Sequence, residues 1–311
     1  MLKKDLNVAI LIPCKNESMS IAKVIKDFQG VLPSSTIYVG DNNSSDNTAA
    51  IAKELGCNVV FEFQPGKGNI VRRLFKEIDA DYFVIVDGDD TYDTTTVVEM
   101  LEKIVALNLD MIIARRTIAK VQKNAERRGH LLGNQIINKA FNYIFKSRYQ
   151  DVLSGYRILS SDFAQTFPSK STGFEIEVEL NAHASWMNAS VLEIDSNYRP
   201  RSDGSASKLR TFHDGAKIFK EIVVLSRRSK PIRHFFIFFF PFAGIALYLV
   251  SRAIVPYFST GYVKNVPSLI VGTSLILLIY TMWSNFLIME QSISNHLSLT
   301  RLLQKRNKKI D

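Results

Sequence analysis

Two long apolar stretches near the C-terminus constrain this chain more than any other feature of its sequence. Every residue of 235–250 is apolar, aromatic, glycine or proline, the run resumes after Arg252 as far as Phe258, and 266–289 contains no charged residue. A helix that crosses a bilayer needs roughly 20 mostly apolar residues. We therefore expect two transmembrane helices, at about 234–256 and 266–289. The alternative, two buried helices of a soluble core, is disfavoured because neither stretch has a polar face.

Basic residues gather on either side of the two stretches and are sparse between them. Four Lys or Arg residues lie within 227–233 and five within 301–309, whereas the connecting region has only Arg252 and Lys264. Cytoplasmic flanks of membrane helices carry the excess of Lys and Arg, and the residues before Val8 do not form a secretory signal. The sequence predicts a two-pass protein of the inner (cytoplasmic) membrane, with both termini and its first domain in the cytosol.

The first part of the chain alternates short apolar runs with segments of helical spacing. We expect strands at 8–13, 36–40, 58–63 and 82–86, and helices at 18–28, 47–55 and 69–77. Strands that alternate with helices are typical of an α/β fold with a mainly parallel, doubly wound central sheet. The predicted organisation is an α/β domain at 1–212, a basic amphipathic juxtamembrane segment at 213–233, the two membrane helices within 234–290 and a basic cytosolic tail at 291–311.

Polar side chains follow each expected strand at its carboxyl end. They are Lys15, Asn16 and Glu17 after the first strand, Asp41–Asp46 after the second, Lys67 after the third, and Asp87, Asp89 and Asp90 after the fourth. The carboxyl ends of such strands lie at one edge of the sheet, where these folds bind ligands. We therefore expect the four loops to form one site.

Asp87-Gly88-Asp89 is the sharpest local motif. Two carboxylates at this spacing can provide hard oxygen ligands for Mg²⁺ or Mn²⁺, whose coordination shell is completed by substrate phosphates and water. A cation bound there would neutralise a leaving diphosphate. The alternative is an acidic turn that caps the next helix, where Asp and Thr are favoured. The convergence of four polar loops favours the metal.

Composition and motif spacing exclude several other classes. The net charge of +9 suits nucleic acid, anionic lipid and phosphorylated substrates alike, but the basic residues cluster at the membrane flanks and not among aromatic residues, which disfavours nucleic acid as a partner. Gly66-Lys67-Gly68 lacks the spacing of a Walker phosphate loop, and the first βα turn lacks the glycines of a dinucleotide fold. Cys14 and Cys57 have no metal-ligand spacing and are expected to be reduced.

The motifs together resemble those of the family 2 glycosyltransferases, which have the GT-A fold. Pro13-Cys-Lys-Asn16-Glu17 matches the family's P-x-x-N-E element, 41–48 its D-x-S-x-D-x-T element and Asp87-Gly88-Asp89 its metal site. Further on, 151–157 resembles D-x-x-S-G-[FY]-R, 173–177 an acidic element near the sugar, and 201–208 the R-x-x-G-x-S-K loop with one additional residue. With its two C-terminal helices the chain is similar to the polyprenyl-phosphate glycosyltransferases, the group that includes dolichol-phosphate mannose synthase and bacterial undecaprenyl-phosphate glucosyltransferases.

The resemblance implies a role for each matched residue. The residues expected to bind the nucleotide sugar are Pro13, Lys15, Asn16, Glu17, Asp41, Asn43, Lys67, Asp87, Gly88 and Asp89. Of these, Asp41 is expected at the base, and Asp87 and Asp89 at the metal. Ser154, Gly155 and Glu175 are expected near the sugar, and the acceptor phosphate is expected to bind Arg115, Arg128, Arg201 and Lys208. The residues expected to carry catalysis are Asp89, Asp151, Arg128 and Lys208.

The implied function is inverting, metal-dependent transfer of a single sugar from a nucleotide-diphosphate sugar, by default UDP-hexose, to polyprenyl (undecaprenyl) phosphate on the cytosolic membrane face. A phosphate monoester is already an anion at neutral pH, so a dedicated base is not obligatory. Two alternatives stay open. One is transfer to a hydroxyl of a lipid or lipid-linked glycan, with Asp151 or Glu175 as base. The other is a non-catalytic nucleotide-sugar-binding membrane subunit. Homo-oligomer formation through the two-helix anchor is also left open.

Overall fold

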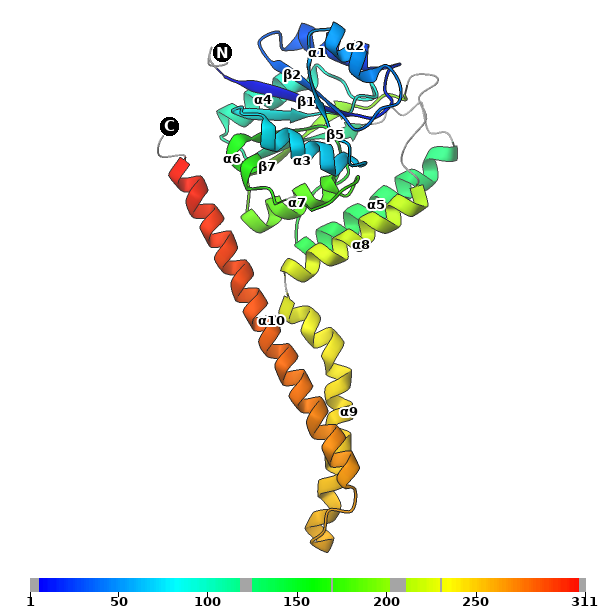
Figure 1. The fold of residues 1–311 in the computed structure, drawn as a ribbon, viewed down its shortest axis with the longest axis vertical. Helices are drawn as coiled ribbons and strands as arrows, with labels where there is room; N and C mark the ends of the chain where they lie inside the picture. The colour runs from blue at the N-terminus through cyan, green and yellow to red at the C-terminus, as the bar shows by residue number, and fades with distance from the viewer. Residues whose placement is uncertain (1–5, 118–124, 169, 202–210, 230, 308–311) are drawn as a thin grey trace. The chain divides into compact units, whose positions relative to one another are not determined.

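The computed structural model describes residues 6–117, 125–168, 170–201, 211–229 and 231–307. These residues fall into two compact units, the first ending at Val223 and the second beginning at Val224 (Figure 1). Helix α8 (Thr211–Ser229) begins in the first unit and ends in the second. It contains both the observed division after Val223 and the boundary that the sequence predicted after position 212.

The first unit is built on a seven-stranded sheet with the order β3-β2-β1-β4-β6-β5-β7. The strands are β1 (Val8–Cys14), β2 (Thr36–Asp41), β3 (Asn58–Phe61), β4 (Tyr82–Ile85), β5 (Met111–Thr117), β6 (Arg157–Ser160) and β7 (Val191–Asn197). The helices of this unit are α1 (Ile21–Val31), α2 (Thr48–Glu54), α3 (Lys67–Glu77), α4 (Thr96–Ala106), α5 (Ala125–Phe145), α6 (Ser161–Thr166) and α7 (Ile176–Met187).

Both faces of the sheet are buried, which explains why its strands are continuous apolar runs. Alternate side chains of β1 point to opposite faces: Ile10 and Ile12 pack with α1 and α4, and Ala9 and Leu11 pack with α3, α6 and α7. Each fully buried aliphatic side chain contributes ~1.5–3 kcal/mol of transfer free energy. Two apolar layers therefore hold the strands rigid up to their carboxyl ends.

The sheet is mainly parallel, as predicted, but β6 is an exception. It runs antiparallel to both of its neighbours, with Ile85 opposite Arg157 and Ile113 also opposite Arg157. After β5 the chain passes through the long helix α5 and re-enters the sheet from the carboxyl edge, so β6 has to run backwards. As a result, residues 151–156, which precede β6, lie at the same edge as the loops that follow the parallel strands.

The second unit is a helical hairpin of α9 (Pro231–Thr260) and α10 (Val266–Asn307). The ring of Phe235 packs at a tilt against the rings of Trp283 and Phe286, with centroids 5.0 and 5.6 Å away. Further along, Gly272 lies against Ala246 and Val250 so closely that a β-carbon would come within 2.7 Å of the Val250 side chain. Glycine at this position lets the two backbones approach, as is common between membrane helices.

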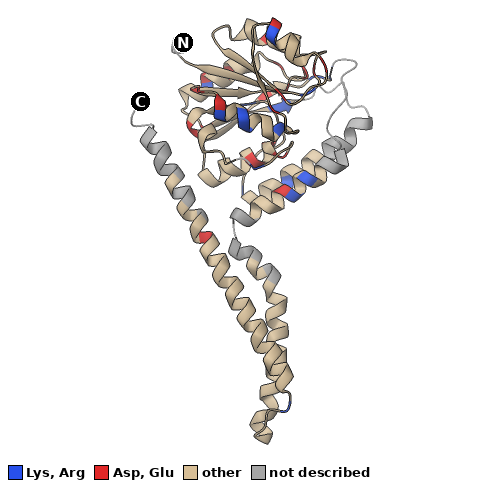
Figure 2. Ribbon diagram, in the orientation of Figure 1, with Lys and Arg blue, Asp and Glu red and all other residues tan. Residues whose placement is uncertain are grey.

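Both hairpin helices are long and apolar enough to cross a membrane. The candidate spans are Phe239–Thr260 and Val266–Ser292. Most of their side chains are exposed, whereas the core helix of a soluble protein would be covered. Figure 2 shows how sparse the charged residues are along the described parts of α9 and α10.

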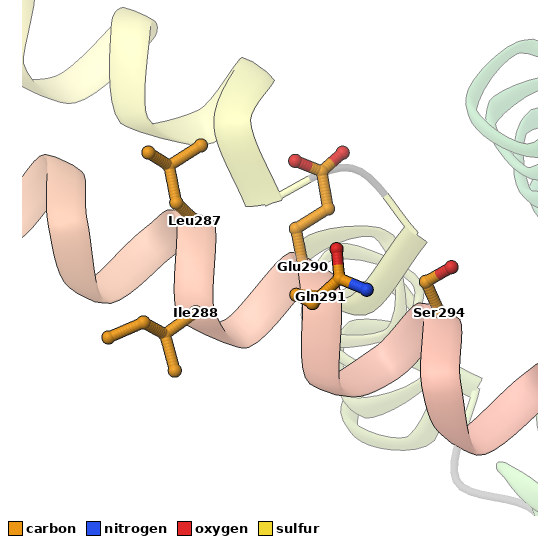
Figure 3. Close-up of a pocket in the computed structure, with 5 residues that line it drawn as sticks. All are labelled: Leu287, Ile288, Glu290, Gln291 and Ser294. Carbon is orange, nitrogen blue, oxygen red and sulfur yellow. The ribbon is translucent and has the colours of Figure 1, made fainter.

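The second apolar stretch ends close to its predicted limit at position 289. Leu287, Glu290, Gln291 and Ser294 follow one another at helical spacing along one face of α10 and line a shallow hollow there (Figure 3). The helix itself continues without interruption to Asn307, through most of the segment that the sequence assigned to a separate tail.

Candidate active site

The loops after β1 and β2 are joined by hydrogen bonds. The backbone N–H of Asn16 donates to Oγ of Ser44 at 3.0 Å, and the Asn16 side-chain oxygen accepts from the N–H of Ser45 at 2.8 Å. Asn16 adopts a left-handed backbone with φ 53°, which asparagine tolerates better than most residues. Two of the predicted loops therefore meet at the carboxyl edge.

Asp41, at the end of β2, is buried and only partly satisfied. One carboxylate oxygen accepts the N–H of Ser44 at 3.2 Å, while Oδ1 is buried and has no hydrogen-bond partner among the described residues. A buried acceptor without a partner costs about 1–3 kcal/mol. Such an atom is well suited to accept a hydrogen bond from a ligand. The neighbouring predicted residues Lys15 and Asn43 are exposed at the same edge.

The glycine turn before α3 is shaped by close packing and not by a phosphate cradle. Gly66 has φ 127°, and a β-carbon there would lie 2.0 Å from the carbonyl oxygen of Thr172. Gly68 donates its N–H to the same carbonyl at 3.0 Å. The turn therefore locks the first residue of α3, Lys67, against the segment that leads into α7.

Lys67 lies between two carboxylates and is largely buried. Its ammonium group pairs with Asp87, and with Glu177 at 2.7 Å. Burial alone would lower the pKa of Lys67, but the two carboxylates hold it above its ordinary value. The pKa of Glu177 is raised by burial, an effect that Lys67 opposes. Glu177 was not among the predicted site residues, although it belongs to the acidic element that the sequence analysis singled out.

Gly155 is the close neighbour of this ion-pair cluster. A β-carbon at Gly155 would lie 2.5 Å from Oδ2 of Asp87 and 2.9 Å from Nζ of Lys67. The N–H of Gly155 donates to the buried hydroxyl of Tyr92 at 2.9 Å, which fixes the backbone there. The predicted residues Gly155, Lys67 and Asp87 thus meet in space.

Asp89 is held by a second basic residue. Its Oδ1 accepts the hydroxyl of Thr91 at 2.6 Å, and its Oδ2 pairs with the guanidinium of Arg201 at 2.7 Å. Burial and the nearby charge of Asp87 raise the pKa of Asp89, while Thr91 and Arg201 oppose that rise. Each carboxylate of the Asp87-Gly88-Asp89 motif is therefore balanced by a cation from a distant part of the sequence.

Short backbone contacts explain why Arg201 reaches Asp89. The N–H of Arg199 donates to the carbonyl of Thr91 at 2.7 Å, and Tyr92 pairs with Tyr198 in an isolated antiparallel bridge. The segment after β7 is thus attached to the loop that follows the Asp87-Gly88-Asp89 motif.

The two carboxylates fit a Mg²⁺ or Mn²⁺ ion that takes its remaining ligands from elsewhere. Among the described residues no group of three or more His, Cys, Asp and Glu side chains could hold a metal. Mg²⁺ is commonly bound by one or two carboxylates together with substrate phosphates and water. Oδ2 of Asp87 accepts no hydrogen bond from the described residues, so it is the more available ligand atom. Gly88 packs against Cys14, where a β-carbon would lie 2.6 Å from the sulfur.

Asp151 is engaged by Arg116. The guanidinium donates to both carboxylate oxygens at 2.7 Å, and the Arg116 N–H adds a third bond at 3.1 Å. Burial acts to raise the pKa of Asp151, but Arg116 outweighs it and holds the pKa below its ordinary value. A carboxylate held in this way accepts a proton poorly. The geometry therefore disfavours Asp151 as a general base.

The remaining predicted residues are spread more widely. Ser154 is buried and donates to the carbonyl of Ala114 at 2.6 Å. Glu175 directly precedes α7, and its Oε2 is buried without a partner among the described residues. Arg115 points away from Arg116, since neighbouring side chains alternate along a strand, and it pairs with Asp195 and Gln150 outside the Asp87 and Asp89 cluster.

Two predicted residues cannot be placed. Lys208 lies outside the described residues, and the side chain of Arg128, in α5, is not described either. Sequence reasoning missed Arg116 and Tyr92 in addition to Glu177. The alternation of side chains along β5 was a signal that could have found Arg116, because Arg115 and Arg116 must face opposite sides of the sheet.

A mainly parallel α/β sheet with a buried Asp41, an Asp87-Gly88-Asp89 turn and two balancing cations at its carboxyl edge defines a nucleotide-sugar transferase of the GT-A type. The model of the family described as Glycosyl transferase family 2 matches residues 9–164, half of the chain. The chain belongs to glycosyl transferase family 2 and is a glycosyltransferase that acts on nucleotide sugars.

Two relatives illustrate the similarity. The chain is 33% identical to glycosyltransferase AglJ of Haloferax volcanii, over 73% of this chain and 75% of AglJ. It is 46% identical to protein RfbJ of Shigella flexneri over 124 residues, which are 40% of this chain and 95% of RfbJ.

Solved structures agree with the fold. Glucosyl-3-phosphoglycerate synthase from Mycobacterium tuberculosis, in a complex with Mn²⁺, UDP-glucose and phosphoglyceric acid, matches with a TM-score of 0.55 and 16% identity, over 71% of this chain and 79% of the synthase. At this identity the match supports the fold alone.

Proposed function

We propose that the protein transfers a single hexose-type sugar from a UDP-sugar, with inversion and with a divalent cation, to a polyprenyl phosphate such as undecaprenyl phosphate. The reaction is proposed to occur on the cytosolic face of the inner membrane, with α9 and α10 as the anchor. The two apolar helices and the basic residues on their flanks support this placement.

The observation that carries the proposal is the pairing of the site carboxylates with cations. Asp87, Asp89, Asp151 and Glu177 each form an ion pair with Lys67, Arg201 or Arg116. None of these four carboxylates is well placed to take a proton from an acceptor hydroxyl. A phosphate acceptor avoids that requirement, because its nucleophilic oxygen is already charged at neutral pH.

The site residues would act through position and charge. Asp87 and Asp89 would hold the divalent cation, which when bound neutralises the departing diphosphate. Asp41 would accept a hydrogen bond from the nucleotide base, and Lys67 would keep Asp87 in place. Arg128 and Lys208 would bind the acceptor phosphate, and the predicted roles of Arg115 and Arg201 at that phosphate belong to the same proposal. Fixed donors and cations of this kind stabilise the transition state without reorganisation.

Transfer to a hydroxyl is the second candidate, and one observation favours it. Glu175 has a buried carboxylate oxygen with no described partner, so it is the remaining candidate for a base. Glu175→Gln would abolish transfer to a hydroxyl and would reduce transfer to a phosphate only slightly.

The test is a transfer assay with the full-length protein in liposomes, using Mn²⁺, labelled UDP- and GDP-sugars, and undecaprenyl phosphate beside diacylglycerol. We expect metal-dependent label on undecaprenyl phosphate from a UDP-sugar. Label on diacylglycerol alone would refute the phosphate acceptor, and donor binding without transfer to any acceptor would favour a non-catalytic subunit.

A matched pair of variants controls the metal assignment. Asp89→Asn should abolish transfer. Asp90→Asn should retain it, because the neighbouring Asp90 carboxylate pairs with Lys23 on α1 at 2.6 Å and not with the cations of the site. Its backbone, with φ 57°, also suits asparagine. Equal activity of the two variants would contradict the metal assignment.

A further inference from the structure

Arg201 pairs with the carboxylate of Asp89, which the proposed function assigns to the divalent cation. The Asp89 side chain is only 4% exposed, and both of its oxygens are engaged, Oδ1 by Thr91 and Oδ2 by Arg201. Asp87 differs, because Lys67 binds only its Oδ1 and no described residue donates to its Oδ2. A divalent cation could therefore approach Asp87 directly, whereas at Asp89 it meets a guanidinium.

The two basic residues differ in how exposed they are. Lys67 is 10% exposed and pairs with both Asp87 and Glu177, so it would keep Glu177 as a partner when a cation binds Asp87. Arg201 is more exposed, at 28%, and belongs to the segment that follows β7. A long, partly exposed side chain can change partners at little cost. Guanidinium also binds carboxylate and phosphate with the same two-pronged geometry.

Charge balance determines when the exchange should occur. A divalent cation on Asp87 and Asp89 repels the guanidinium of Arg201, and a nucleotide diphosphate bound to that cation brings negative oxygens into the same space. Arg201 would then lose a carboxylate partner and gain a phosphate partner in one step.

We propose that Arg201 is an exchangeable counter-ion: it neutralises Asp89 in the metal-free protein and moves to a phosphate group when a divalent cation and a nucleoside diphosphate bind. The proposal rests on the metal-dependent reaction proposed above. It makes cation binding and diphosphate binding cooperative through one residue, and by linkage the coupling acts equally in both directions.

The experiment measures Mn²⁺ binding to the full-length protein in detergent by electron paramagnetic resonance, with and without saturating UDP. Without UDP, Arg201→Ala should bind Mn²⁺ about ten-fold more tightly than the wild type, because the competing cation is gone. With UDP this advantage should disappear, so that the factor by which UDP tightens Mn²⁺ binding falls about ten-fold. Arg201→Lys should lie between the two.

Arg199→Ala is the matched control. Arg199 lies two positions away on the same segment, but it faces Asp93 at 3.9 Å and is 53% exposed. Its removal takes away the same charge from the same region and should leave both Mn²⁺ affinities unchanged. An equal gain in Mn²⁺ affinity for Arg201→Ala and Arg199→Ala would mean that net charge alone sets the affinity, and it would overturn the proposal.

Other outcomes separate the two levels of inference. If Arg201→Ala binds Mn²⁺ no more tightly than the wild type without UDP, Arg201 does not compete with the metal and the exchange is refuted. If the affinity rises but the effect of UDP is unchanged, the transfer to phosphate is refuted. If the wild type binds no Mn²⁺ even with UDP, the metal-dependent function itself fails. Arg201→Gln, which removes the charge but can still donate to Asp89, repeats the test should the alanine variant fold poorly.

Discussion

Replacing Gly155 by alanine should impair the site while leaving the fold intact. The added β-carbon would lie 2.5 Å from Oδ2 of Asp87 and 2.9 Å from Nζ of Lys67, whereas ordinary contact begins at 3.4 Å. The carboxylate, which is partly exposed, can retreat by about 1 Å, and a displacement of that size can cost ~10²-fold in rate. The backbone of Gly155 lies outside the left-handed region, so alanine introduces no conformational strain.

The assay compares sugar transfer, Mn²⁺ affinity and urea unfolding for Gly155→Ala and the wild type. We expect roughly 100-fold slower transfer and weaker Mn²⁺ binding, with a free energy of unfolding within about 1 kcal/mol of the wild type, since the loss of chain entropy in the unfolded state partly offsets the local clash. Gly30→Ala is the control, because a β-carbon at Gly30 in α1 meets nothing within 4 Å. Wild-type transfer by Gly155→Ala would refute the assignment of Asp87 to the site.

Three further changes test other parts of the structure. Asp151→Asn should lower the free energy of unfolding by about 3 kcal/mol at pH 7, because the buried Arg116 loses its charged partner. This loss should shrink as the pH falls below about 4, because the depressed pKa of Asp151 gives the wild type stability that is lost on acidification through the folded pKa. A loss that is independent of pH in urea unfolding would contradict this. Tyr92→Phe should cost about 1–2 kcal/mol in the same assay by leaving a buried N–H without its acceptor, whereas an unchanged midpoint would show that the hydrogen bond contributes nothing. Gly272→Leu should lower the thermal midpoint in detergent by separating α9 and α10, and Gly244→Leu, where a β-carbon meets nothing, should not; equal midpoints would argue against close packing at Gly272.

The sequence predicted the first four strands because their information is local. Apolar runs of four to seven residues, each followed by a polar loop, became β1, β2, β3 and β4 with limits within two residues of those expected. The direction of β6 was not predictable in this way. It depends on where α5 returns the chain to the sheet, and that is decided by packing between residues far apart in the sequence.

The same distinction applies to the site. The loops that follow β1, β2 and β4 could be assigned to one edge of the sheet from strand order alone. The partners of Lys67 could not be assigned, because Glu177 reaches it from α7, more than a hundred residues later. A pattern of residue types identifies which groups can carry charge, but the pairing of those charges follows from the tertiary fold.

The bridge between Tyr92 and Tyr198 has a consequence for protein engineering. The turn that contains Thr91 and the segment that leads to Arg201 share backbone hydrogen bonds, so the two should be exchanged together when a chimera is made. A chimera that takes the segment after β7 from a relative, but keeps the native 90–93 turn, would pair two backbone segments that come from different proteins. Importing both segments at once preserves the backbone pairing, and this gives a practical rule for recombining these segments within the family.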